Sequence, residues 1–245
     1  MYWKTEGVVL RETDYKEHDR LLTVLTRDHG PVTMKARGVR GRRSTLKAAC
    51  QLLAYSEFTV SEQRGYLTIT EAVTKEQFPA LRQDIELLSL ASYFTQVSET
   101  IAQEDCPNPE LLSLLLNCLY ALGPLHKPQP VVKAVFELRS ICLAGYLPEL
   151  SGCFVCGNPM PDRFDLVHGI LQCSGCGPGQ GTLVPLSAAA RTALHYITAC
   201  GPKQIFSFTV DDVTAEELSQ LSEAYLMTQL ERGFHTLDFY KSLKR

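Results

Sequence analysis

The sequence has no long apolar run. Its longest such stretch, Leu111 to Leu122, is interrupted by Ser113 and Asn117 and is too short to cross a bilayer. Charged residues, Lys4 and Glu6 among them, stand near the start, where a secretory signal peptide needs an uninterrupted apolar segment. These absences predict a cytoplasmic protein that neither enters a membrane nor is exported.

Motifs for two kinds of chemistry are also missing. None of the six histidines begins the H-x-E of zinc-dependent deaminases, and no G-x-x-x-x-G-K-[ST] loop is present to hold the phosphates of ATP. No pair of titratable residues stands out as a general acid and a general base. The sequence therefore predicts a protein that is not an enzyme.

Acidic residues are absent between His29 and Ser56, although the whole chain has a net charge of -3. Residues 1–82 hold 14 Lys and Arg against 10 Asp and Glu, and the remaining residues hold 10 against 17. This asymmetry predicts a basic ligand-binding module attached to an acidic body.

Six cations lie inside the acid-free window and are expected to lack counter-ions; we call residues 35–47 the basic loop. Because like charges on one loop repel, the arrangement predicts binding of a polyanion such as a nucleic-acid backbone. A solvated loop without a ligand is the alternative. Gly38 and Gly41 predict a flexible loop, and Tyr55, Phe58 or Tyr66 could stack on bases. For each of these aromatic residues taken alone, packing in the core or on the surface is the favoured alternative. Together with Arg11, the predicted DNA contacts are Lys35, Arg37, Arg40, Arg42, Arg43 and Lys47.

The densest acidic group of the N-terminal part is Asp14, Glu17 and Asp19. As magnesium ligands, these residues would indicate a metal-dependent nuclease. Their neighbours Lys16 and Arg20 favour a solvated turn of mixed charge instead. The nuclease remains the alternative function, and a protein adaptor that uses the leucine-rich helices is a third.

Four of the nine cysteines follow the pattern C-x2-C-x16-C-x2-C, which is typical of two knuckles that hold one zinc ion. Four thiolates fill the tetrahedron and leave no position for water or substrate, so the zinc is predicted to be structural. The alternative, a pair of disulfides, requires an oxidising compartment. The predicted ligands are Cys153, Cys156, Cys173 and Cys176; buried inert thiols are predicted at Cys50, Cys106, Cys118, Cys142 and Cys200.

The first 80 residues predict a β-barrel. Short segments rich in Val, Thr, Leu and aromatic residues are separated by turn signals such as Asp28 to Pro31, and five antiparallel strands in this length fit a small Greek-key barrel of the OB type. The predicted strands are Lys4–Arg11, Arg20–Arg27, Pro31–Arg37, Leu52–Val60 and Tyr66–Val73.

From Phe78 and Pro79 onward, the apolar period changes from two to 3.6 and predicts helices. Asn108 and Ser187 predict helix N-caps, and Thr214 to Glu217 predict a capping box. A short hairpin is predicted between the cysteine pairs. The fold class is therefore α+β: an OB domain at residues 1–80 and a helical domain at residues 81–245 with an inserted zinc finger at residues 150–184.

Several segments in order resemble the RecO family of bacterial DNA-repair mediators. Thr5 to Arg11, Asp14 to Thr26 and His29-Gly30 resemble the family's opening. Lys35 to Arg40 is similar to its AKGxR stretch, with arginine where lysine is commoner, and Gln51 to Phe58 continues the match.

This resemblance implies a protein that binds single- and double-stranded DNA and anneals complementary strands without ATP. It also implies partnership with RecR and with single-stranded-DNA-binding protein in loading RecA, at the bacterial nucleoid. It further implies an OB domain followed by a helical domain that carries a zinc finger.

Overall fold

The computed structural model describes residues 2–244 and divides into two compact units. The first contains the chain up to Leu125 and again from Phe234, and the second is His126–Gly233. The chain therefore leaves the first unit once and returns to it with its last helix. The boundary near residue 80 stays a prediction.

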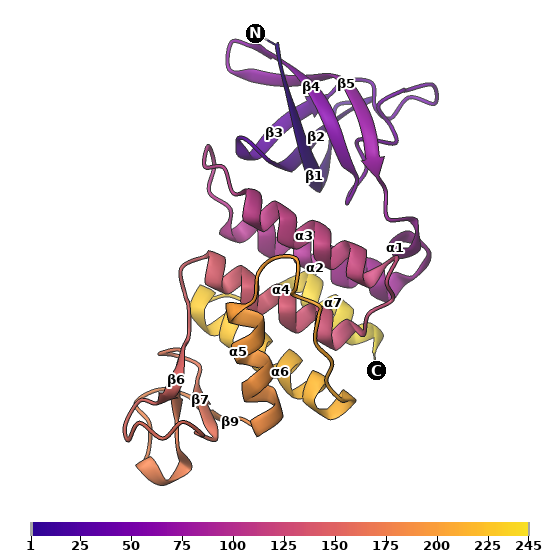
Figure 1. Ribbon diagram of the computed structural model, residues 1–245. Coiled ribbons are helices and arrows are strands. Elements are labelled where there is room, and N and C mark those ends of the chain that lie inside the picture. The colour runs from indigo at the N-terminus through magenta and orange to yellow at the C-terminus, as the bar shows by residue number, and fades with distance from the viewer. Residues whose placement is uncertain (1, 245) are drawn as a thin grey trace. The chain divides into compact units, whose positions relative to one another are not determined.

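Five strands form a closed barrel in the first unit (Figure 1). Their order around the barrel is β1-β2-β3-β5-β4, which confirms the predicted OB-type barrel. The strands are β1 (Tyr2–Tyr15), β2 (Asp19–Thr26), β3 (Gly30–Ala36), β4 (Tyr55–Gln63) and β5 (Tyr66–Glu76).

One strand pair departs from the predicted antiparallel arrangement. β3 and β5 are parallel, with Lys35 opposite Thr68, whereas the other barrel pairs are antiparallel. An odd number of strands cannot close into a ring with every neighbour antiparallel, so at least one pair must be parallel.

Alternate residues of the barrel strands point inward and form one core. Phe58, which was considered as a possible stacking residue, belongs to this core and is fully buried, which confirms the alternative that it is a packing residue. Leu53 adopts a left-handed conformation with a φ of 67° and β4 begins only at Tyr55, later than predicted. The core includes Val9, Leu22, Val24, Met34, Ala36, Phe58, Val60 and Ile69.

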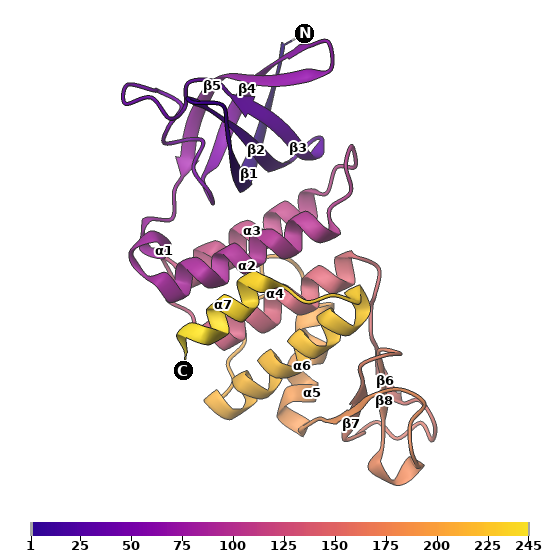
Figure 2. The ribbon, with the colours of Figure 1, turned by 180° about the vertical axis from the view of Figure 1, so that it is seen from behind.

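Four helices complete the first unit: α1 (Pro79–Gln83), α2 (Ile85–Ile101), α3 (Pro109–Leu122) and α7 (His235–Leu243). The predicted cap at Asn108 is confirmed, because its Oδ1 accepts the N–H of Leu111 at 2.9 Å. α7 lies beside α2 in both views (Figures 1 and 2). The rings of Tyr93 and Phe234 meet edge to face at 5.5 Å, which attaches the end of the chain to α2.

The second unit contains α4 (Gln129–Leu143), α5 (Ala188–Ala199) and α6 (Asp212–Leu230). Ser187 caps α5 as predicted, since its Oγ accepts the N–H of Ala190 at 3.1 Å. The capping box predicted at Thr214 is wrong. α6 begins earlier because Asp211 is an equally suitable cap, and its carboxylate accepts the N–H of Thr214 at 2.8 Å.

A small sheet in the second unit carries the cysteines. Its strands β6 (Glu149–Cys153), β7 (Arg163–Asp165), β8 (Ile170–Gln172) and β9 (Leu183–Pro185) are arranged in the order β6-β8-β7-β9. β7 and β8 form the predicted hairpin. Phe164 of β7 packs edge to face on Tyr225 of α6 at 5.1 Å, which attaches the sheet to the helices.

Candidate metal centre and candidate nucleic-acid interface

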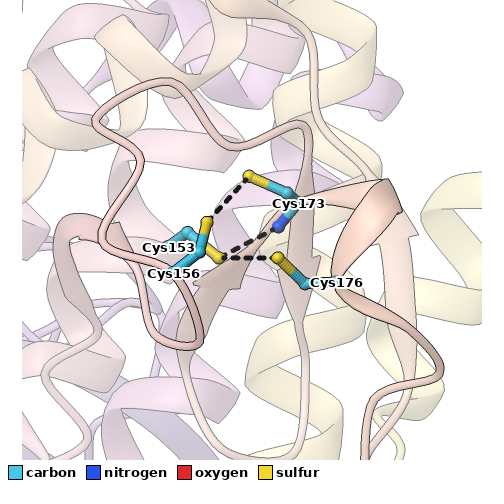
Figure 3. A group of neighbouring side chains, drawn as sticks. All are labelled: Cys153, Cys156, Cys173 and Cys176. Carbon is cyan, nitrogen blue, oxygen red and sulfur yellow. Dashed lines mark hydrogen bonds between the residues drawn. The ribbon is translucent and has the colours of Figure 1, made fainter.

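The four patterned cysteines meet at one point (Figure 3). Cys153 ends β6, Cys173 directly follows β8, and the metal-ligating atoms of all four lie within 4.8 Å of one another. The Sγ atoms of Cys153 and Cys176 are 3.8 Å apart, and those of Cys156 and Cys173 are 3.9 Å apart. The sequence pattern thus correctly predicted a four-cysteine cluster.

These distances fit a tetrahedral metal ion and do not fit disulfides. A zinc–sulfur bond of about 2.3 Å places neighbouring sulfurs of a tetrahedron about 3.8 Å apart. A disulfide requires about 2.05 Å, and all nine cysteines are free thiols. The disulfide alternative is therefore wrong for this structure.

Local backbone geometry explains how the two knuckles gather their sulfurs. Gly157 and Gly177, each directly after the second cysteine of a pair, have φ values of 72° and 85°, which favour glycine. The backbone N–H of Cys173 donates to the Cys153 Sγ at 3.3 Å, and the Asn158 side-chain amide donates to the Cys173 Sγ at 3.2 Å. These donors orient the sulfurs and favour negative charge on them.

The same hydrogen bonds act on thiol ionisation. The backbone N–H of Cys156, with those of Cys173 and Val155, lowers the pKa of the Cys153 thiol to about 6 against the effect of desolvation. The hydrogen bond with the Cys156 side chain and desolvation raise the pKa of Cys176 to about 12. Cys153 is therefore poised as a thiolate, while Cys176 holds a proton that a metal ion would displace.

The remaining five cysteines contribute no metal ligands within the described part of the chain. Burial raises the pKa of Cys50 to about 12 and that of Cys118 well above its ordinary value, as expected for inert buried thiols. Cys106 is an exception, because it is exposed. Its predicted burial is wrong: it lies in the irregular segment between α2 and α3.

Four of the predicted DNA contacts are exposed cations in the basic loop between β3 and β4. None of them forms an ion pair with any residue that the structure describes. Such charges remain fully available to a polyanionic ligand. They are Arg37, Arg42, Arg43 and Lys47.

The other three predicted contacts are ion-paired. The Lys35 Nζ lies 2.9 Å from Asp19, and the Arg40 Nη1 lies 3.4 Å from Asp14. Arg11 lies 2.9 Å from Glu99 of α2. The expectation that the six loop cations lack counter-ions is therefore wrong for Lys35 and Arg40, because their acidic partners lie on the adjacent β1–β2 hairpin, outside the acid-free window.

The basic loop is also bound to the β1–β2 hairpin through its backbone. The Gly38 N–H donates to the Asp19 carboxylate at 2.8 Å, and the Arg40 N–H donates to the His18 carbonyl at 3.1 Å. The Gly41 N–H closes a turn onto the Gly38 carbonyl at 3.0 Å. The glycines therefore form defined turns, whereas the sequence predicted a flexible loop.

Two of the three acidic residues considered as magnesium ligands are engaged in ion pairs with arginine or lysine, and the third, Glu17, is exposed and lies 3.8 Å from His18. Asp14 pairs with Arg20 at 2.9 Å as well as with Arg40, and Asp19 pairs with Lys35. Between residues 2 and 244, the cysteine cluster is the one group of His, Cys, Asp or Glu residues arranged to hold a metal ion. Asp14 and Asp19 thus anchor the basic loop.

The aromatic residues of the barrel differ in exposure. Tyr66 is 78% exposed, whereas the hydroxyl of Tyr55 donates to Glu6 at 2.5 Å. Sequence reasoning missed Tyr15, which is 39% exposed at the end of β1. The Nζ atoms of Lys35 and Lys16 lie 5.0 and 5.5 Å from its ring centroid. Alternation of aromatic and basic residues at a predicted hairpin was the signal that could have found it.

Among the helices of residues 2–244, none combines the length and the apolar character that crossing a membrane requires.

A closed barrel with a cationic loop, followed by helices and a four-thiol cluster, defines a two-unit protein with a candidate structural metal centre and a candidate polyanion surface. Comparison with known proteins identifies the family. Residues 1–78 match the model "Recombination protein O N terminal", and residues 82–238 match "Recombination protein O C terminal". The chain belongs to the RecO family.

Relatives align over nearly the whole chain. A protein of Acetivibrio thermocellus named "DNA repair protein RecO" is 32% identical over 246 residues, which cover 100% of this chain and 98% of the relative. A protein of the same name from Anaeromyxobacter sp. (strain K) is 36% identical over 94% of this chain and 92% of its own length. The Bacillus pumilus relative is 30% identical over 92% of this chain and 88% of its own length.

Proposed function

We propose that this protein is a DNA-binding mediator of recombinational repair that binds single- and double-stranded DNA through the basic loop. The observation that carries the proposal is the set of exposed, unpaired cations at Arg37, Arg42, Arg43 and Lys47. Such cations bind phosphates without regard to sequence and release counterions as they do so. The anchored turns of the loop hold these charges in place before DNA arrives.

Membership of the RecO family supports a more specific role. The protein anneals complementary strands without ATP and acts with RecR and single-stranded-DNA-binding protein to help load RecA. It performs no catalysis of its own. It works in the cytoplasm, at the nucleoid. The relatives' shared name, "DNA repair protein RecO", is consistent with this assignment.

One zinc ion is the cofactor in this proposal, held by Cys153, Cys156, Cys173 and Cys176. The sulfur separations and the glycine turns fit a closed tetrahedral site. Zinc there would hold the two knuckles together and keep the small sheet folded.

A titration of labelled DNA at several salt concentrations, with an annealing assay alongside, tests the proposal. If the four unpaired cations each neutralise one phosphate, log K against log salt has a slope of about -3 on single strands. Annealing proceeds without ATP. Absence of salt-dependent DNA binding would favour the protein-adaptor alternative.

The nuclease alternative requires a different result. Cleavage of DNA that depends on magnesium and disappears in Asp14→Ala or Asp19→Ala would establish it. The ion pairs of both carboxylates speak against such a role.

A further inference from the structure

We propose that Tyr15 and Tyr66 are base-stacking residues that make the barrel prefer unpaired over paired DNA. This inference rests on the proposed DNA binding and deepens it, because it assigns the chemical form of the ligand at this surface. The evidence for it is the register of the barrel strands, which is independent of the basic loop.

Register places both tyrosines on one face of the barrel. Tyr15 is opposite Asp19 across β1 and β2, Leu21 is opposite Lys35 across β2 and β3, and Lys35 is opposite Thr68 across β3 and β5. Residues two apart on a strand share a face, so Asp19 goes with Leu21, and Thr68 with Tyr66.

That face is the outer one. The intervening residues Leu22, Met34 and Ile69 point the other way and form the buried core. Lys35 therefore lies on the outside, between the two tyrosines. By this register the two tyrosines are three strand spacings and four residues apart. With about 4.8 Å between strands and about 3.3 Å between residues, the distance between them along the sheet is about 20 Å. A stretched single strand of a few nucleotides can contact both rings.

The chemistry of the two side chains suits an unpaired base. Both rings are exposed, and the ammonium groups of Lys35 and Lys16 lie 5.0 and 5.5 Å from the Tyr15 centroid. Lys35 is paired with Asp19, so Lys16 is the group that attracts a phosphate flanking a stacked base. Base–aromatic stacking is tolerant of sequence, because every base offers a flat π-face. In a duplex these faces are covered by neighbouring base pairs, so the rings gain little there.

Other aromatic residues of the barrel are less suitable. Phe58 is in the core, and the ring of Trp3 packs against that of His29 in a tilted contact with the centroids 4.4 Å apart. Tyr2 is opposite Ser61 of β4, and Ser61 is opposite Thr68 of β5, so Tyr2 belongs to the same outer face and cannot serve as a control. Tyr120 is 49% exposed on α3, outside the barrel, and provides the matched control.

The test compares Tyr15→Ala, Tyr66→Ala, the double variant and the control Tyr120→Ala, which should bind every strand as the unaltered protein does. Affinity is measured by fluorescence anisotropy for oligothymidylate, for a mixed-sequence duplex and for an abasic strand of equal length. We expect each single change at Tyr15 or Tyr66 to weaken oligothymidylate binding about tenfold. Duplex affinity and the salt slope should stay unchanged, since the rings are neutral. Tyr15→Phe and Tyr66→Phe should bind as the unaltered protein does.

The unaltered protein gives a second readout that does not depend on the folding of a variant: it should bind oligothymidylate more tightly than the abasic strand. Equal affinity for these two strands would overturn the inference. So would an equal loss for single strands and duplex in the alanine variants, or no loss in either. If neither DNA form binds in a salt-dependent way, the proposed function itself fails, which is a distinguishable result.

Discussion

Lys35 donates to one oxygen of Asp19 at 2.9 Å, and the other oxygen of that carboxylate accepts the Gly38 N–H at 2.8 Å. An acidic residue thus fixes the start of a loop that is proposed to bind a polyanion. Asp19 positions the neighbouring arginines of the loop, and in doing so it neutralises the charge of Lys35.

Asp19 gives this anchor a pH dependence. The hydrogen bond from Lys35, followed by that from Gly38, lowers the pKa of Asp19 below its ordinary value of 3.8. A lowered folded-state pKa contributes stability that is present above 3.8 and is lost as the pH falls through the folded-state value. We expect Asp19→Asn to lower the thermal midpoint near neutral pH and to differ less from the unaltered protein in acid. Thermal unfolding of both proteins across the acid range checks this; a constant difference would contradict it.

Gly181 is required where its backbone passes over a buried carboxylate. A Cβ there would lie 2.1 Å from the Asp165 Oδ1, whereas a Cβ on Gly175 meets nothing within 4 Å. We expect Gly181→Ala to destabilise the second unit by about 1–3 kcal/mol, as overpacking does. Gly175→Ala is the matched control and should change stability by less than about 0.5 kcal/mol. Denaturant unfolding measures both, and similar losses in the two variants would show that the contact does not matter.

The metal centre predicts a loss of local order when one ligand is removed. Cys156 is exposed, so Cys156→Ser changes little packing but deprives a metal of one thiolate. We expect zinc content to fall from one ion per chain, and amide exchange to accelerate between the cysteine pairs. Elemental analysis and hydrogen exchange are the measurements. Freshly purified unaltered protein without zinc would refute the assignment of the ion.

A buried ion network joins α4 to α6. The Lys133 Nζ lies 3.0 Å from Glu137 and 3.0 Å from Glu223, and it donates to the Ser219 carbonyl at 2.9 Å. Lys133→Met leaves Glu137 buried without this partner, so we expect a loss of about 3–5 kcal/mol of stability. Adding Glu137→Leu should restore part of it. Chemical unfolding of both single variants and the double variant measures the coupling energy between Lys133 and Glu137. If the stability losses of the two single variants add up to that of the double variant, the two residues are not coupled.

Features set by neighbouring residues were predictable from the sequence. The caps at Asn108 and Ser187 and the C-x-x-C knuckles depend on residues close in the chain, and the structure has them where expected. The cap at Asp211 was missed because two suitable residues stand three apart. The pairing of Arg11 with Glu99 joins positions 88 residues apart, and no local pattern indicates it. The return of α7 to α2 likewise depends on the tertiary contact of Phe234 with Tyr93.

A parallel pair somewhere in the barrel was within reach of sequence reasoning, since five strands were predicted and an odd ring requires one, although parity does not indicate that β3 and β5 form it. Sequence reasoning could not show which cations of the basic loop are ion-paired and which are unpaired. The partners Asp14 and Asp19 become neighbours of the loop only when β1, β2 and β3 align.

The measurement that tests the central claim most directly is the salt dependence of DNA affinity in a triple variant, Arg37→Ala, Arg42→Ala and Arg43→Ala. The matched control removes the same charge at Lys127, Lys203 and Lys241. The account predicts that the loop variant folds normally, weakens every DNA sequence alike and flattens the single-strand slope by about two, from about 0.7 for each lost phosphate contact. The control should keep the slope of the unaltered protein. An unchanged slope and affinity in the folded loop variant would contradict the account and place the DNA site elsewhere.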